Sequence, residues 1–236
     1  DNNVFRIDTL TNTVVGSPIT VEDAPTGLAV NPDGSFVYVT NFSSSTVSVI
    51  NTLSNTVTDT IMVGPGPAGV AVSPDGSRVY TANNPGNVSV IDTSTNMVIA
   101  TVTVGTQPRG VVVTPDGNFV YASNSASGTV SVIRASDNTV IDTVTVQSLP
   151  QGLDVTPDGN FVYVANQGPG TVSVIRTSDN TVIDTISVGN VSWGPSAFGK
   201  FIGPSPVTLD IMLTGSGVGN VNATGIDCGD GGTDCM

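Results

Sequence analysis

Short apolar runs alternate with clusters of turn-forming residues along most of the chain. Residues 108–147 show this best, with the runs GVVV, FVYAS, TVSVI and TVIDTVTV separated by PDG, SASG and SDN. Val, Ile, Thr and Tyr favour the pleated surface of a β-sheet, whereas Pro, Gly, Asp and Asn each stabilise turns. No stretch keeps a helical period over three turns. The stretch therefore predicts four antiparallel strands joined by tight turns.

This four-strand pattern recurs along the chain. The triplet Pro-Asp-Gly begins at four positions spaced by 42, 41 and 42 residues, namely Pro32, Pro74, Pro115 and Pro157. A Val-Tyr pair follows each triplet at a constant distance. A four-stranded sheet with two apolar faces must be covered on both sides, and repeats of about 40 residues with four strands are typical of propeller blades. We therefore predict an all-β propeller with four complete blades of about 42 residues, at 25–64, 67–106, 108–147 and 150–189.

The second strand of each repeat ends in a recurring motif. It reads YVTN at 38–41 and YTAN, YASN and YVAN in the other copies. This motif resembles the YVTN family of β-propeller repeats, best known from bacterial and archaeal cell-surface and surface-layer proteins. The resemblance covers about residues 3–203. It implies a propeller outside the cell and therefore an extracellular, secreted protein.

Both ends of the propeller region, 1–203, depart from the repeat. Residues 4–21 align with the third and fourth strands of a blade only, and 192–203 resembles a diverged first strand. Residues 1–22 and 193–203 would then form one composite blade that closes a five-bladed ring. Alternatively, the chain is a piece of a longer propeller, such as a seven-bladed one. We favour the second interpretation because the sequence begins within a blade.

Residues 204–236 predict a linker and a short β tail that begins a further domain. The segment LTGSGVGNVNATGIDCG resembles a Gly/Ser/Cys-containing repeat found behind propellers in secreted bacterial proteins. Cys228 and Cys235 enclose six residues, a loop that a disulfide can close in an oxidising compartment. Three nearby carboxylates form a weak candidate calcium site that lacks the EF-hand spacing, and a solvated acidic loop is the simpler interpretation: Asp227, Asp230 and Asp234.

Charge and hydropathy argue against several classes of function. The net charge of −13 arises from only six Lys and Arg residues against 19 Asp and Glu residues. Nucleic-acid binding requires basic groups that neutralise phosphates, and an anionic membrane surface would repel this chain. No apolar run reaches 18 residues, so no transmembrane helix is predicted. We therefore expect neither nucleic-acid binding nor membrane insertion.

Groups that carry out catalysis are scarce. The chain has no His, the most common general base, and no G-x-S-x-G or P-loop motif. The aspartates of the Pro-Asp-Gly triplets are explained as turn formers. Asp154 stands in a first strand where the other repeats carry Ala or Val, and we expect a hydrated residue beside the central channel. We therefore predict no enzyme activity and no cofactor, and keep a lactonase-like or hydrolase-like propeller acting through Asp154 as a remote alternative.

Loops that vary among the repeats indicate where a partner would bind. The turns on one rim are nearly identical, whereas the loops on the opposite rim differ in every copy. Polar and aromatic candidates gather on that variable rim: Phe42, Arg109, Gln151, Gln167 and Trp193. Ordinary loop surface accounts for the same residues. If they do form a site, their composition suits a protein or a cell-surface polysaccharide.

Our leading hypothesis is a non-catalytic extracellular module for surface display or interaction. The alternative is a structural subunit of a surface layer or extracellular filament that self-associates through open strand edges. Four Asn-x-Ser/Thr sequons are candidate glycosylation sites: Asn41, Asn87, Asn190 and Asn222. Arg134 and Arg176 are expected to form exposed ion pairs with Asp142 and Asp184, each contributing roughly 0 to 1 kcal/mol.

Overall fold

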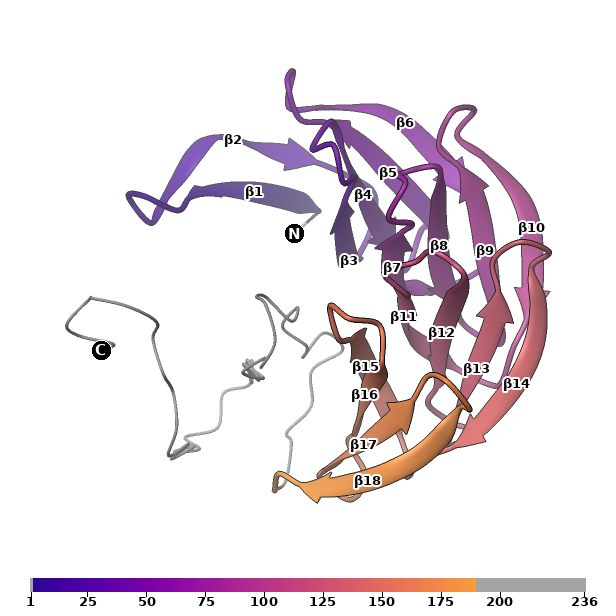
Figure 1. Cartoon of the computed structure of the whole chain (residues 1–236). Helices are drawn as coiled ribbons and strands as arrows, with labels where there is room; N and C mark the ends of the chain where they lie inside the picture. Colours follow the sequence, from indigo (N-terminus) through magenta and orange to yellow (C-terminus); the bar gives the residue numbers. More distant parts are fainter. Residues whose placement is uncertain (1, 190–236) are drawn as a thin grey trace.

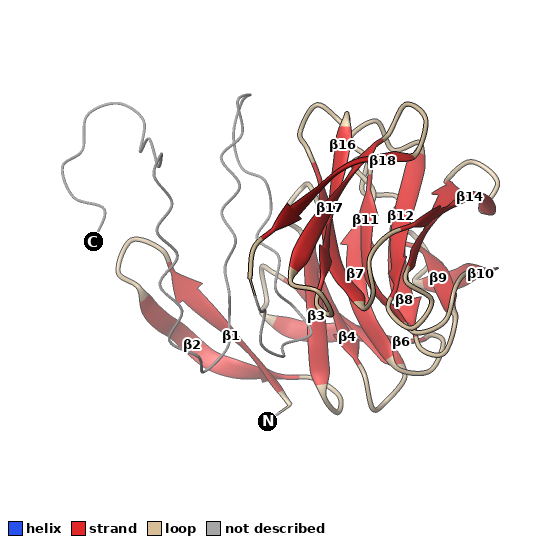
Figure 2. Cartoon of the chain, turned by 90° about the horizontal axis from the view of Figure 1, so that it is seen from below, coloured by secondary structure: helices blue, strands red, loops and turns tan. Residues whose placement is uncertain are grey.

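The computed structural model describes residues 2–189, which form 18 β-strands and no helix (Figures 1 and 2). The strands make four antiparallel four-stranded sheets and one two-stranded sheet. Each four-stranded sheet is one blade, and the blades follow one another in an arc, so the predicted all-β propeller is confirmed. Within the described residues no helix could cross a membrane.

The strands run in chain order within each sheet. The two-stranded sheet comprises β1 (Asn3–Asp8) and β2 (Thr13–Thr20). Blade one comprises β3 (Pro25–Val30), β4 (Phe36–Asn41), β5 (Thr46–Asn51) and β6 (Thr56–Met62). Blade two comprises β7 (Pro67–Val72), β8 (Arg78–Asn83), β9 (Asn87–Asp92) and β10 (Met97–Thr103). Blade three comprises β11 (Pro108–Val113), β12 (Phe119–Asn124), β13 (Thr129–Arg134) and β14 (Thr139–Thr145). Blade four comprises β15 (Pro150–Val155), β16 (Phe161–Asn166), β17 (Thr171–Arg176) and β18 (Thr181–Ser187).

The position of a strand within its blade decides how deeply it is buried. The two middle strands of blade three are mostly buried, because blades two and four cover both of their faces, whereas the outermost strands β14 and β18 are mostly exposed. The first strands β3, β7, β11 and β15, here called the inner strands, lie nearest the centre of the arc (Figure 1). Each inner strand packs against the next. The inner strands therefore position whatever faces the central channel.

Tyrosines fill the interfaces between consecutive blades. Tyr38, Tyr80 and Tyr121 are each 1% exposed. Each lies in an apolar cluster with Val and Ile side chains of the following blade. Burying an aromatic side chain removes about 150–250 Å² of surface from water. The Val-Tyr pair that marks the repeat is therefore the main packing element between blades.

The turns follow the chemistry that the sequence predicted. An Asn adopts a positive φ in the turn between the third and fourth strands of every blade, at Asn55, Asn96, Asn138 and Asn180. Asn tolerates this left-handed conformation better than most residues. In each Pro-Asp-Gly turn the Asp carboxylate accepts a hydrogen bond from the backbone N–H two residues later, at 2.8–3.0 Å. These carboxylates therefore serve the fold.

One expectation from the sequence is wrong, and another concerns residues that the structure does not describe. Arg134 and Arg176 do not pair across their hairpins. Each instead forms an ion pair with the Asp three residues later in its own turn, Asp137 and Asp179, because that carboxylate lies on the same tight turn. Residues 193–203, predicted to complete the composite blade with 1–22, and the tail 204–236 lie outside the described residues, so these assignments stay predictions.

Candidate functional site

The inner strands share one sequence, Pro-x-Gly-x-x-Val, and one backbone irregularity. A register shift follows the proline in all four. A Cβ on Gly69 would lie 2.5 Å from the carbonyl oxygen of Arg109, and a Cβ on Gly110 would lie 2.8 Å from that of Gln151. Only glycine allows two backbones to approach this closely. The glycines therefore hold the residues at the second position of neighbouring inner strands side by side.

Charged side chains occur on only two of the inner strands. Arg109 on β11 is the only cation and Asp154 on β15 is the only carboxylate in the four segments. Gln151 joins them at the position on β15 that corresponds to Arg109 on β11. Blades one and two carry Thr or Ala at these positions. Polar chemistry on the inner strands is therefore concentrated in blades three and four.

The Arg109 guanidinium lacks the ion pair that three other described arginines have. The residue is half-buried, and its Nε is buried with no hydrogen-bond partner among the described residues. A buried donor without a partner costs about 1–3 kcal/mol. Three other arginines form ion pairs of 2.6–2.8 Å: Arg78 with Asp92, Arg134 with Asp137 and Arg176 with Asp179. Arg109 is therefore available to donate hydrogen bonds to an oxygen of a ligand.

A short hydrogen-bond network fixes Gln151 beside Arg109. The Gln151 Nε2 donates to Ser125 Oγ at 2.9 Å, and the Ser123 hydroxyl donates to the backbone carbonyl of Gln151. Ser123 Oγ in turn accepts from the Gly110 N–H at 2.9 Å, which links β11, β12 and β15. Sequence analysis missed both serines. The signal was weak, because small hydroxyl residues are common throughout this chain.

Asp154 lies three positions further along β15. It is half-buried, and its Oδ1 accepts a hydrogen bond from the Val155 N–H at 2.9 Å. It stands opposite Tyr163 in the register of β15 and β16. Its counterparts in the other blades, Ala29, Ala71 and Val112, cannot accept hydrogen bonds through their side chains. Asp154 is therefore the single carboxylate that the described inner strands offer for acid–base chemistry.

The predicted rim residues Phe42 and Gln167 lie on separate blades. Phe42 follows β4, and its ring atoms lie 3.3–3.4 Å from where a Cβ of Gly66 would stand, so this ring packs on the loop that leads into blade two. Gln167 follows β16 and its N–H donates to the Leu149 carbonyl at 3.0 Å. Trp193 lies outside the described residues. The structure thus brings together Arg109 and Gln151, and it leaves Phe42 in blade one.

The sequons differ in accessibility. Asn41 is fully buried and its Nδ2 donates to Thr46 at 3.0 Å and Ser48 at 2.9 Å, so a glycan there would break a buried network. Sequence alone gave no sign of this burial. Asn87 is half-buried and accepts a hydrogen bond from Asn83. The other two sequons, the predicted disulfide and the candidate calcium site lie outside the described residues: Asn190, Asn222, Cys228, Cys235, Asp227, Asp230 and Asp234.

The turn carboxylates have strongly acidic pKa values for a structural reason. Hydrogen bonds from the Ser73 hydroxyl and then from the Ser77 backbone and hydroxyl lower the pKa of Asp75 to about 2. The pKa values of Asp33, Asp116 and Asp158 are also lowered, first by a neighbouring hydroxyl. These groups are ionised and engaged in their own turns. Within residues 2–189 no three Asp, Glu, His or Cys side chains are grouped so that they could hold a metal ion.

Comparisons with known proteins bear on both fold and chemistry. A family model described as lactonase, seven-bladed β-propeller, matches residues 48–141 and 110–183. Together these matches cover more than half of the chain. A search of curated proteins finds no match.

Solved structures of similar fold include the following two. A chain of hydrazine synthase from Kuenenia stuttgartiensis is 25% identical with a TM-score of 0.67, over 70% of this chain and 49% of that one. A protein of unknown function from Desulfotomaculum acetoxidans is 22% identical with a TM-score of 0.73, over 85% of this chain and 66% of that one. The chain therefore spans about half of the first protein and about two thirds of the second.

The family match overturns the leading hypothesis from the sequence. A non-catalytic module for surface display is wrong as the functional assignment, because the matching family is one of lactonases. The prediction rested on the YVTN resemblance, the variable rim and the scarcity of catalytic groups, His among them, but carboxylate and guanidinium groups can also move protons and stabilise an oxyanion. The comparisons support a β-propeller, and they support neither the YVTN type nor the surface-layer type.

Proposed function

The chain belongs to the family of seven-bladed β-propeller lactonases, and we propose that it hydrolyses a small cyclic ester at the inner strands of blades three and four. One observation carries the proposal: Asp154 and Arg109 are the only ionisable side chains on the four inner strands. They occupy adjacent strands whose backbones are in close contact at Gly110. Ester hydrolysis is accelerated by a proton acceptor and by a donor that stabilises the oxyanion, and in the proposal these two side chains have those roles.

The reaction adds one water molecule across the acyl C–O bond of a lactone. The water oxygen bonds to the carbonyl carbon, the ring C–O bond breaks, and the leaving oxygen takes up a proton to give the open hydroxy acid. A positioned carboxylate can accept the proton from the attacking water and return it to the leaving oxygen. Asp154 has this role in the proposal.

Arg109 would stabilise the oxyanion that develops on the lactone carbonyl. Its guanidinium forms no ion pair among residues 2–189, so no ion pair must break before it donates to a substrate oxygen. Preorganised donors of this kind are worth about 10²–10³ in rate when one is removed. Gln151, fixed by Ser125, supports the neighbouring strand and acts as a positioning residue.

The test is hydrolysis of a panel of five- and six-membered lactones by the full chain, followed by proton release at constant pH. Asp154→Asn is expected to lower the rate by at least about 100-fold, because it removes the proton acceptor and keeps the shape. The matched control is Asp184→Asn in the same blade, on the exposed outermost strand β18, which should retain the full rate.

Two outcomes would overturn the proposal. One is a wild-type chain that hydrolyses no lactone above the uncatalysed rate. The other is an Asp154→Asn variant as active as Asp184→Asn. Arg109→Gln gives a second test. If the hydrogen bond from Arg109 to the oxyanion strengthens only in the transition state, this variant should lower kcat by about 10²-fold with little change in KM.

The finer assignments from the sequence stay proposals. The YVTN type of repeat is supported by the motif at 38–41, and secretion is supported by the scarcity of Lys and Arg. A protein or polysaccharide partner and a disulfide between Cys228 and Cys235 also remain predictions. Fractionation of the source cells with an antibody against the chain would test secretion, and a purely cytoplasmic signal would contradict it.

A further inference from the structure

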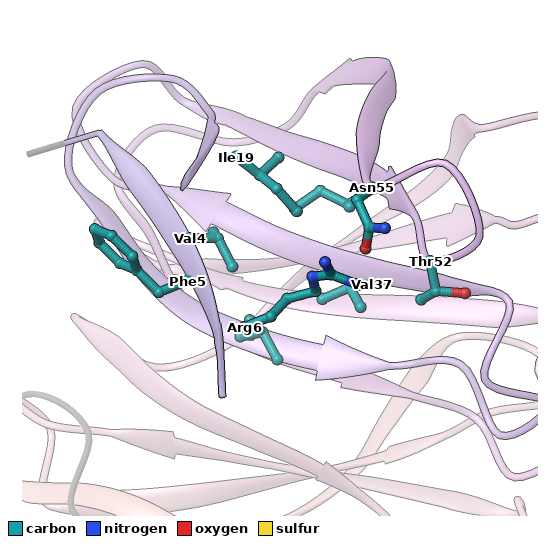
Figure 3. Close-up of a pocket in the computed structure, with 9 residues that line it drawn as sticks. Val4, Phe5, Arg6, Ile19, Val37, Thr52 and Asn55 are labelled. Carbon is teal, nitrogen blue, oxygen red and sulfur yellow. The ribbon is translucent and has the colours of Figure 1, made fainter. Parts of the chain in front are cut away.

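The three junctions between complete blades share an apolar core and differ in the polar groups at their inner ends. Each contains one apolar cluster with a buried tyrosine. The junction between the β1–β2 sheet and blade one has no tyrosine and holds an apolar pocket of about 340 Å³, here called the β1–β2 pocket, whose lining includes Leu28, Val37 and Ile50 (Figure 3). The three tyrosine-filled junctions lie wholly within the described residues, so they can be compared position by position.

A hydroxyl group bridges the inner strands at two of these three junctions. Between blades one and two, Thr40 Oγ1 accepts a hydrogen bond from the Gly27 N–H at 2.8 Å and donates one to the Ala68 carbonyl at 2.7 Å. Between blades three and four, Ser123 Oγ accepts from the Gly110 N–H at 2.9 Å and donates to the carbonyl of the second residue of β15. Each hydroxyl thus pairs with a backbone donor of its own blade and a backbone acceptor of the next.

The junction between blades two and three has no such hydroxyl. Ala82 stands at the position of the two bridging side chains. The corresponding backbone donor is the Gly69 N–H, and the corresponding acceptor is the Arg109 carbonyl. Gly69 has no partner residue on β8, because the register of β7 shifts at this point. Neither backbone group therefore has the hydroxyl partner that its counterparts have.

Blades two and three do not lie closer together to make up for the missing hydroxyl. A Cβ on Gly69 would stand 2.5 Å from the Arg109 carbonyl oxygen. The equivalent distance is 2.8 Å for Gly110 and shorter for Gly27. The separation of the inner strands at this junction therefore lies between the separations at the two bridged junctions, and the place of the hydroxyl is kept.

A second hydroxyl is also missing from this junction. Between blades one and two, Thr26 Oγ1 donates to the Pro67 carbonyl at 3.1 Å, whereas its counterpart in blade two is Ala68. Both alanines are buried, with exposed fractions of 5% for Ala68 and 0% for Ala82. Buried backbone donors and acceptors are nearly always paired, and an ordered water is the partner where no protein group serves. Room for two hydroxyls beside buried backbone groups is the setting that such a water requires.

We propose that one ordered water molecule is bound between β7 and β11, in the place that a hydroxyl group takes at the other two junctions. The water oxygen accepts a hydrogen bond from the Gly69 N–H. Its two hydrogens are donated to the carbonyls of Arg109 and Pro108, the second being the counterpart of the Thr26 acceptor. About three hydrogen bonds are usual for a buried water. This water ties blade two to the backbone of Arg109, and the proposal does not depend on the lactonase function.

The first test is a crystal structure of the full chain at a resolution that shows ordered water. We expect one water oxygen within about 3.2 Å of both the Gly69 nitrogen and the Arg109 carbonyl oxygen. In the Ala82→Ser variant the new hydroxyl should replace this water and make the same bonds. Ser123→Ala is the reciprocal variant, in which a water should appear at the junction between blades three and four.

The second test is the unfolding equilibrium of two variants in urea. Ala82→Ser should change the unfolding equilibrium constant by less than about threefold, because its hydroxyl takes over bonds that the water already makes. Val90→Thr is the matched control, because Val90 is buried in the same apolar cluster as Ala82. Its new hydroxyl would enter apolar surroundings, so this variant should raise the constant at least about tenfold.

Each of four results would overturn the proposal. The wild-type crystal structure has no water between Gly69 and Arg109. The hydroxyl in the Ala82→Ser variant bonds to neither backbone group. Ala82→Ser destabilises the chain as much as Val90→Thr. Ser123→Ala admits no water, which would mean that the place of the hydroxyl does not hold one.

Discussion

The junction between blades three and four and the junction between β1–β2 and blade one are built from equivalent positions. In the first, Leu153 is almost completely buried, while in the second its counterpart Leu28 is half exposed. The strands that carry the two leucines, β15 and β3, have the same length and the same register with their neighbours. The difference comes from the strand on the far side. Tyr121 covers Leu153, and no described side chain covers Leu28 in the same way.

This comparison shows that the apolar face of a blade is buried by side chains of the adjacent blade. A blade contributes one apolar face to the interface before it and one to the interface after it, as in other repeat proteins, where stability is approximately a sum of repeat and interface contributions. Blade one therefore has one complete interface, toward blade two, and one incomplete interface.

The largest expected difference comes from truncating the two leucines. Leu153→Ala should lower the free energy of unfolding by about 2–4 kcal/mol, because it leaves a cavity among closely packed side chains. Leu28→Ala should lower it by less than about 1 kcal/mol, because the side chain is half exposed. Urea denaturation of the two variants measures both values. Equal losses would mean that the two junctions are equally closed in solution.

A smaller effect is expected from single hydroxyl groups. Tyr121→Phe should lower stability by about 1 kcal/mol, because Asn180 Oδ1 loses its donor. Tyr80→Phe is the matched control: Tyr80 is equally buried, but its hydroxyl makes no hydrogen bond among the described residues, so the change should be within about 0.5 kcal/mol. Two identical losses in the same denaturation assay would contradict the assignment of the Tyr121–Asn180 bond as specific to its junction.

The smallest contrast is expected from acid, because every complete blade has a Pro-Asp-Gly turn after its inner strand, and blade two, which carries Asp75, belongs to neither junction. The folded-state pKa of Asp75 is lowered to about 2, chiefly by the Ser73 hydroxyl. A lowered pKa adds stability above the ordinary value near 3.8, and this stability is lost as the pH falls toward 2. Thermal unfolding should therefore shift to lower temperature between about pH 4 and pH 2.

Ser73→Ala removes the first of these donors and should move the acid transition to higher pH. Hydrogen exchange of β3–β4 and β15–β16 then compares the two junctions as the pH falls. Similar acceleration in both pairs is expected because each contains such a turn. A transition that Ser73→Ala leaves unchanged would contradict the role of the turn carboxylate.

The fold was predictable because each of its elements depends on local chemistry. Turn residues such as Gly34 and Asn55 have positive φ where the sequence places Gly and Asn, and a Val-Tyr pair contributes to each interface between two complete blades. The ion pairs were not predictable from strand spacing. Arg134 reaches Asp137 in its own turn before it can reach Asp142, because the nearer carboxylate requires less ordering of the side chain.

The candidate site was only partly predictable. Asp154 stands out because its counterparts in the repeat are Ala or Val, and Arg109 stands out as the one cation at a position that otherwise holds Thr, Ala or Gln. The positions could therefore be found, but their chemistry was undervalued because the chain has no His. The β1–β2 pocket was missed altogether. The β1–β2 sheet contributes no tyrosine to its junction with blade one. That difference became informative only once the structure showed that a tyrosine fills each junction between complete blades.

The contact between neighbouring inner strands has an evolutionary consequence. Gly69 and Gly110 meet the carbonyl oxygens of Arg109 and Gln151, and the side chains of those two residues take no part in the contact. After duplication of a blade, this position can accumulate substitutions without disturbing how the copies fit together. A single substitution at this position can therefore introduce a new reactive group and leave the backbone contact between the inner strands unchanged.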